Sequence, residues 1–184
     1  YEDKNNKGFI NIAGMQSPGL SSACAIAPDV LKMLENSGLT LEAKEDINVT
    51  LGNTVIEKIY TDGNIDLNAK DVAVQNDKLH IKANKLTANV NTFGTSEHKI
   101  QTEIQTLDLE SAKDVYMNQK DDLQVEKLKA NETIDLQAKD TTIKEMSGKD
   151  IKLDVGNLSL GTIKATEKIE LKVLGNVTGD EREG

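Results

Sequence analysis

The chain has few of the residues that build compact enzyme cores or disulfide frameworks. Tryptophan is absent, aromatic residues make up 3% of the 184 residues, and Cys24 is the one cysteine. A single cysteine excludes an intrachain disulfide, and its small apolar neighbours favour a buried, inert thiol over a nucleophile. The scarcity of large rings favours a narrow, elongated core of aliphatic side chains.

Positive charge is also scarce. Acidic residues outnumber basic ones by 31 to 22, which gives a net charge of −9, and Arg182 is the one arginine. Nucleic-acid binding requires a basic stripe with stacking aromatics, so we expect no nucleic-acid partner. No stretch approaches the roughly 20 apolar residues that cross a bilayer, so we expect no membrane span. Because the sequence begins with Tyr1 rather than methionine, we expect a piece of a longer protein.

Proline is confined to one end of the chain. Pro18 and Pro28 are the two prolines, and none occurs from Leu39 onward. A ladder of stacked strands excludes proline because each backbone N–H donates to a neighbour. This distribution predicts three segments: a strand–turn–helix segment over 1–38, a repeat domain over 39–179, and a charged tail over 180–184. In the first segment, the sequence predicts a short buried strand over 9–13 and a tight turn with glycine and proline over 14–20, and the capping pattern predicts a helix over 21–36.

One seven-residue phrase occurs twice with a single change. Residues 65–71 read Ile-Asp-Leu-Asn-Ala-Lys-Asp, and residues 134–140 read Ile-Asp-Leu-Gln-Ala-Lys-Asp. Looser copies lie at 39–46, 79–84, 107–114 and 169–173. The copies alternate apolar and polar residues, which is the period of a strand with one buried face.

Strands this short cannot bury their apolar faces alone, so neighbouring copies must stack. The sequence therefore predicts a mainly β fold: a parallel β-helix, or solenoid, with a short N-terminal strand–turn–helix segment. Turns of about 20 residues with insertions would produce the uneven spacing of the copies, and we expect six or seven such turns. An antiparallel sandwich, with strands every ~8–12 residues, is the alternative.

The L-x-L-x-A-K-x-D-I phrases over about 39–179 resemble the repeat region of filamentous haemagglutinin-like adhesins, which are large secreted proteins of Gram-negative bacteria. The resemblance implies a structural or adhesive segment at the cell surface or secreted. Its outer faces would bind a protein or glycan partner on a host or matrix. Residues 163–179 are also similar to bactofilins, cytoplasmic filament formers with a β-helix core, which implies a self-polymerising scaffold as an alternative. Open solenoid ends also favour end-to-end self-association.

The N-terminal segment over 1–48 is similar to a different family. Its stretches over 8–20, 25–27 and 38–48 resemble the last flavin-contacting segment of FAD-dependent oxidoreductases of the glycerol-3-phosphate dehydrogenase type. That resemblance implies FAD as cofactor, with Gly14, Ser17, Gly19 and Leu20 lining the flavin. The alternative function is therefore a fragment of such an oxidoreductase, and otherwise we expect no cofactor. The segment over 1–38 could instead cap the solenoid.

No residue is assigned a catalytic role, and the sequence favours a non-enzymatic protein without excluding an enzyme. Polysaccharide-cleaving sites use aromatic platforms, whereas the repeat region has only Tyr60, Phe93 and Tyr116. His80 alternates with Leu79 and Ile81, which predicts an outward, solvated side chain, and we expect the same of His98.

We also expect no metal site. Four aspartates follow lysines within the repeated phrases and are predicted to occupy similar corners of the solenoid. The lysine–aspartate pairs are Lys70 and Asp71, Lys113 and Asp114, Lys139 and Asp140, and Lys149 and Asp150. Stacked carboxylates could bind Ca²⁺, but the glycine-rich repeat of calcium-binding β-rolls is absent from the sequence. A corner ladder of alternating lysine and aspartate is the simpler expectation.

Overall fold

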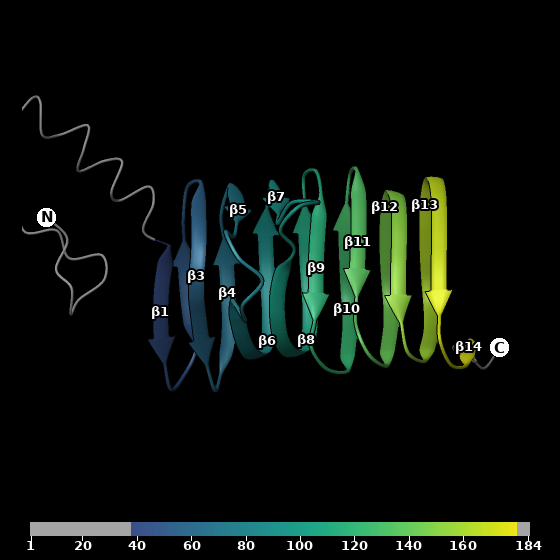
Figure 1. Cartoon of the computed structure of the whole chain (residues 1–184), viewed down its shortest axis with the longest axis horizontal. Helices are drawn as coiled ribbons and strands as arrows, with labels where there is room; N and C mark the ends of the chain where they lie inside the picture. Colours follow the sequence, from purple (N-terminus) through teal and green to yellow (C-terminus); the bar gives the residue numbers. More distant parts are fainter. Residues whose placement is uncertain (1–37, 180–184) are drawn as a thin grey trace, which may run out of the picture.

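The repeat region folds as a parallel β-solenoid. The structure is a computed structural model that describes residues 38–179, and the strands in this range pair only in parallel. Successive turns stand side by side along the long axis, from β1 to β14 (Figure 1). This arrangement confirms the predicted parallel β-helix and is incompatible with an antiparallel sandwich.

Each turn contributes strands to two stacks. One stack contains β1 (Leu39–Ala43), β3 (Thr54–Thr61), β5 (Asp71–Ala73), β7 (Thr92–Phe93), β9 (Val115–Gln119) and β11 (Thr133–Gln137). The other contains β2 (Ile47–Thr50), β4 (Asn64–Asn68), β6 (Ile81–Val90), β8 (Ile100–Ser111) and β10 (Leu123–Ala130). The long strands β12 (Thr141–Val155) and β13 (Leu158–Val173) belong to both stacks, and β14 (Val177–Gly179) extends the even-numbered one. We call these the odd stack and the even stack. The first residues of β6 and β8 also reach the odd stack, where they pair with β3 and β9.

The number of turns follows from one column of aligned residues in the even stack. Its members in the described range are Ile47, Ile65, Leu86, Leu107, Val125, Ile143, Leu160 and Gly179. The step along the chain is shortest from Ile143 to Leu160 and longer from Ile65 to Leu86, so the turns differ in length. The eight positions correct the expected six or seven turns. At about 4.8 Å per step they span about 34 Å.

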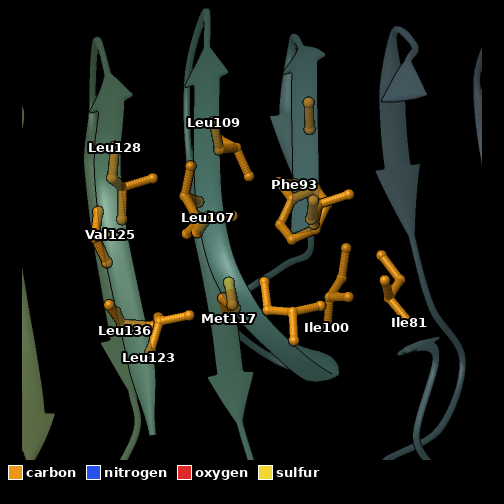
Figure 2. Close-up of a cluster of buried hydrophobic side chains, with 14 of the residues drawn as sticks. Ile81, Phe93, Ile100, Leu107, Leu109, Met117, Leu123, Val125, Leu128 and Leu136 are labelled. Carbon is orange, nitrogen blue, oxygen red and sulfur yellow. The ribbon is translucent and has the colours of Figure 1, made fainter. Parts of the chain in front are cut away.

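Alternation of buried and outward side chains fills the interior, and it is interrupted within β3, β10 and β12, where two outward residues follow one another. In β4, Ile65 and Leu67 are buried, whereas Asn64, Asp66 and Asn68 are exposed. Their neighbours along the axis are aliphatic as well, so the core is a narrow column of isoleucine, leucine and valine (Figure 2). Burying one such side chain contributes about 1.5–3 kcal/mol, but only when the next turn covers it.

The two best copies of the repeated phrase lie in different stacks. Ile65 begins the first copy in β4 of the even stack, and Ile134 begins the second copy in β11 of the odd stack. Each copy is therefore a strand followed by a corner, and a full turn contains two such units. This half-turn unit explains why the intervals between copies were uneven.

The corner after β7 requires a glycine. Gly94 has a φ of +80°, the one positive φ among residues 38–179. Its N–H donates to the carbonyl of Val72, and a Cβ at this position would lie 2.5 Å from the carbonyl oxygen of Tyr116. The loop that follows returns the chain to β8, beside the buried ring of Phe93 (Figure 2).

The expected strand over 9–13, the turn over 14–20, the helix over 21–36 and the tail over 180–184 lie outside the described residues. The three-segment division stays a prediction. Within 38–179, no helix is present that is long and apolar enough to cross a membrane.

We predict that Gly94→Ala destabilises the solenoid, because the new Cβ meets both a strained φ and the carbonyl of Tyr116. The expected loss is about 1–3 kcal/mol. Gly52→Ala is the matched control, since no atom lies within 4 Å of its added Cβ. Denaturant unfolding followed by far-UV circular dichroism measures both variants. Equal midpoints for the two would contradict the assigned corner.

Candidate binding surface

A shallow polar groove runs along one corner of the solenoid, from β10 to β14. It encloses about 580 Å³. Its floor is the buried column Leu123, Thr141 and Leu158. One wall consists of Asp122, Asp140, Asn157 and Asn176, and the other of Gln124, Thr142, Ser159 and Thr178. The turns that begin β10, β12 and β13 each add the same three elements: an acidic or amide side chain, a buried residue and a neutral polar side chain. The last row, Asn176 to Thr178, has the same polar residues, but its middle residue, Val177, is exposed.

The first wall is a hydrogen-bonded ladder. Asp140 accepts hydrogen bonds from the backbone N–H and the Nδ2 of Asn157, both at 2.9 Å. Asn157 Oδ1 in turn accepts from the N–H of Asn176 at 2.8 Å, and Asp122 accepts from the N–H of Asp140 at 3.3 Å. The hydrogen bonds from Asn157 hold the pKa of Asp140 below its usual value, so its carboxylate stays ionised.

The second wall carries no charge. Gln124, Thr142, Ser159 and Thr178 are paired turn by turn, so their side chains form one column. Hydroxyl and amide groups both donate and accept hydrogen bonds. The groove thus sets a neutral hydroxyl and amide row opposite a carboxylate and amide row, with a repeat of about 4.8 Å. This arrangement suits an extended ligand with its own repeating polar groups.

The predicted aspartate ladder divides between two corners. Asp71, Asp114 and Asp150 share one corner, but Thr92 and Thr133 alternate with them along the column. Thr92 Oγ1 donates to Asp71 at 3.0 Å, and the N–H of Thr133 donates to Asp114 at 3.1 Å. Asp140 lies in the groove wall at the other corner instead. The expectation of one shared corner was therefore wrong, because the repeated phrase occurs in both stacks.

The lysines of the repeated phrase do not pair with the aspartates beside them. Lys139 pairs with Asp121 of the preceding turn at 2.8 Å, and Lys149 lies 3.5 Å from Glu132 and 3.6 Å from Glu167 in the turns on either side. Within 38–179, ion pairs between turns are the rule: Lys58–Glu42, Lys82–Glu103, Lys99–Asp135, Lys120–Glu103, Lys127–Glu110, Lys144–Glu126, Lys152–Asp135 and Lys172–Asp154.

Glu103 is the most heavily paired of these acids. Lys120 binds it at 2.7 Å and Lys82 at 2.8 Å, from the turns on its two sides. Hydrogen bonds from Lys120 and then Lys82 lower the pKa of Glu103. The Glu103 carboxylate thus links three successive turns. Both of its oxygens already bind lysines of the same chain.

His80 is buried, which corrects the expected solvated position. Its exposed fraction is 0%, and its Nδ1 accepts the N–H of Gln101 at 3.1 Å. The strand begins one residue later, at Ile81, so the alternation extrapolated from the sequence does not reach His80. Since Nδ1 accepts, the neutral ring carries its proton on Nε2. That nitrogen has no hydrogen-bond partner among the described residues.

His98 lies in the loop after Gly94 and is half-buried rather than fully solvated. Its Nδ1 has no hydrogen-bond partner among residues 38–179. In the same range, no three histidine, cysteine, aspartate or glutamate side chains converge as a metal site would require. Phe93 is buried, and Tyr60 donates its hydroxyl to the carbonyl of Leu79 at 2.7 Å.

Two features went unnoticed in the sequence. Thr102 and Gln119 lie inside the core, where the hydroxyl donates to Gln119 Oε1 at 2.6 Å and Gln119 Nε2 donates to the carbonyl of Ile104 at 2.6 Å. The groove was also missed, although the Asn or Asp that begins each turn near 122, 140, 157 and 176 is a visible signal. Gly14, Ser17, Gly19 and Leu20, which would line a flavin, lie outside the described residues.

Comparison with known proteins places the chain in no family. No protein-family model matches it, and no solved structure matches it. A stretch of 42 residues, 23% of this chain, is 55% identical to a glycerol 3-phosphate dehydrogenase of Caloramator mitchellensis. The match covers 9% of that dehydrogenase. It is therefore a local similarity. The matched protein is of the same enzyme type that the segment over 1–48 resembles.

We predict that His80 makes the fold less stable in mild acid. Burial lowers the pKa of His80, and the carboxylates of Glu57 and Asp77 oppose this only in part. The unfolded chain therefore binds this proton at a higher pH than the folded chain does. Stability should fall as the pH drops below about 6.5, by at most about 1.4 kcal/mol per pH unit for one proton.

Chemical unfolding between pH 5 and 8 measures this dependence. His80→Asn keeps an acceptor for the N–H of Gln101 but cannot titrate, so its stability should change less over that range. An unchanged slope in the variant would show that other groups cause the acid sensitivity.

Proposed function

We propose that residues 38–179 are a rigid structural segment of a bacterial surface or secreted protein, and that the segment binds an extended protein or glycan partner. The continuous parallel ladder over eight aligned positions supports the structural role. Every stacked turn lengthens the segment by about 4.8 Å and adds outer surface without adding a cleft.

The groove supports the binding role. Its second wall presents exposed Thr142 and Thr178 with Ser159 between them, and these hydroxyls lie in register. Its first wall adds the Asp140 carboxylate, held ionised and in place by Asn157. Repeated donors and acceptors along a line favour a chain-like partner, because each unit of the partner meets the same set of groups. The chain is acidic overall, which disfavours strongly acidic partners.

The alternative is a fragment of an FAD-dependent oxidoreductase of the glycerol-3-phosphate dehydrogenase type. The 42-residue similarity to the dehydrogenase supports it. Against it, the sequence contains no G-x-G-x-x-G motif. In dinucleotide-binding folds this motif binds the pyrophosphate, so the part that would bind the ADP half of FAD is missing from the sequence. Under this alternative, Gly14, Ser17, Gly19 and Leu20 would line the flavin.

The test is binding of the purified chain to arrays of glycans and matrix proteins, with groove and control variants. Thr142→Lys with Ser159→Lys fills the groove with two long side chains. Asn68→Lys with Asn89→Lys adds the same charge at exposed, paired positions of β4 and β6, away from the groove. We expect at least tenfold weaker binding for the groove variant and unchanged binding for the control.

Two outcomes contradict the proposal. Equal binding by both variants would place the partner elsewhere on the surface. A yellow preparation with flavin absorbance near ~450 nm, and no binding to any array component, would favour the oxidoreductase alternative.

A further inference from the structure

The loop over 74–80 is an insertion between β5 and β6 that folds against the core. The turn that contains it, from Ile65 to Leu86, is longer than the turn from Ile143 to Leu160. The loop is buried at both ends, at residue 74 and at residue 80, and exposed at residues 77–78. It therefore covers interior side chains without being part of the stacked strands.

Few bonds hold this loop to the solenoid. Within 38–179, no backbone hydrogen bond joins residues 74–79 to a neighbouring turn. The N–H of Lys78 donates to Oδ1 of Asn76 at 3.0 Å, which closes the tip of the loop on itself. The hydroxyl of Tyr60 donates to the carbonyl of Leu79 at 2.7 Å. The remaining attachment is His80, at the end of the loop.

His80 binds the strands on both of its sides. Its carbonyl accepts the N–H of Ile59 at 2.7 Å, and its own N–H donates to the carbonyl of Gln101 at 2.9 Å. Its ring Nδ1 also accepts the N–H of Gln101 at 3.1 Å. Nδ1 can accept this bond only while the ring is neutral. A proton on Nδ1 would set two donors against each other inside a fully buried site.

The surroundings of the ring disfavour its charged form. Burial lowers the pKa of His80, and Glu57 of β3, Asp77 of the loop and the backbone of Asn76 oppose this only in part. The side chain of β8 at the ring, that of Gln101, is neutral. The ring therefore binds a proton much more readily once it has left this site.

We infer that the loop over 74–80 is a pH-dependent conformational switch, which is closed while His80 is neutral and opens when the ring is protonated, with the stacked strands left intact. Opening breaks the bonds of His80 and exposes what the loop covers. It also removes Asp77 and Leu79 from one side of a pocket of about 440 Å³ that Gln101 lines as well. The acid effect is then local, and it is independent of the groove and its partner.

Hydrogen–deuterium exchange of the full 184-residue chain at pH 7.5 and pH 5.5 tests the switch. Protection is expressed relative to the exchange rate of an unstructured peptide at the same pH. We expect residues 74–82 to be less protected than residues 123–137 at both pH values, and low denaturant to leave their exchange unchanged, as in local opening. Their protection should fall up to about tenfold at pH 5.5, because the open state binds one more proton.

Three variants separate the ring from the rest of the loop. His80→Asn keeps an acceptor but cannot titrate, so residues 74–82 should be equally protected at both pH values. Tyr60→Phe removes the other bond to the loop. It should lower protection several-fold at both pH values and keep the pH dependence. His98→Asn, in the neighbouring loop, is the control and should behave as the unchanged chain does.

Three results would overturn the inference, once far-UV circular dichroism has shown that each variant is folded. The first is equal protection of residues 74–82 and 123–137 at both pH values, since the loop would then open only with the whole solenoid. The second is a loop whose protection does not depend on pH in the unchanged chain. The third is the same pH dependence in His80→Asn as in the unchanged chain.

Discussion

The parallel hydrogen-bond ladder between successive turns is the constraint on which the rest of this structure depends. A turn of about 20 residues buries no core alone, because its two short strands have apolar side chains on one face only. The ladder fixes each turn at one register against the next and brings like residues into columns. Columns of isoleucine, leucine and valine then form the core, and columns of polar residues form the outer surface.

That constraint also decides which functions the molecule can perform. The interior is filled by aliphatic side chains, with Phe93 as its largest buried residue and a small satisfied cluster at Thr102 and Gln119. Charged groups on the outside are largely neutralised by partners one turn away, as Glu103 is by Lys82 and Lys120. What remains available is repetitive outer surface, including the polar groove along one corner. This supports the proposed structural and binding role.

The sequence was sufficient to predict the architecture, and its errors have a common physical cause. Alternation and the absence of proline after Pro28 identified a parallel solenoid. Register could not be read, because the repeated phrase marks half a turn, and its best copies at Ile65 and Ile134 fall in different stacks. The same ambiguity misplaced Asp140. His80 was misassigned because alternation holds only inside a strand, and β6 starts at Ile81. The groove depends on pairing between turns, which one sequence does not show.

Disulfide trapping tests the register of the turns most directly. In a Cys24→Ser background, Thr142→Cys with Ser159→Cys places two thiols at paired positions of adjacent turns, about 4.8 Å apart. Thr142→Cys with Thr178→Cys places them two turns apart, at about 10 Å, beyond the roughly 7 Å limit for a disulfide. The parallel solenoid predicts that the first pair oxidises readily and the second stays reduced, as measured by titration of free thiols. Oxidation of the second pair in preference to the first would contradict the fold and every inference drawn from it.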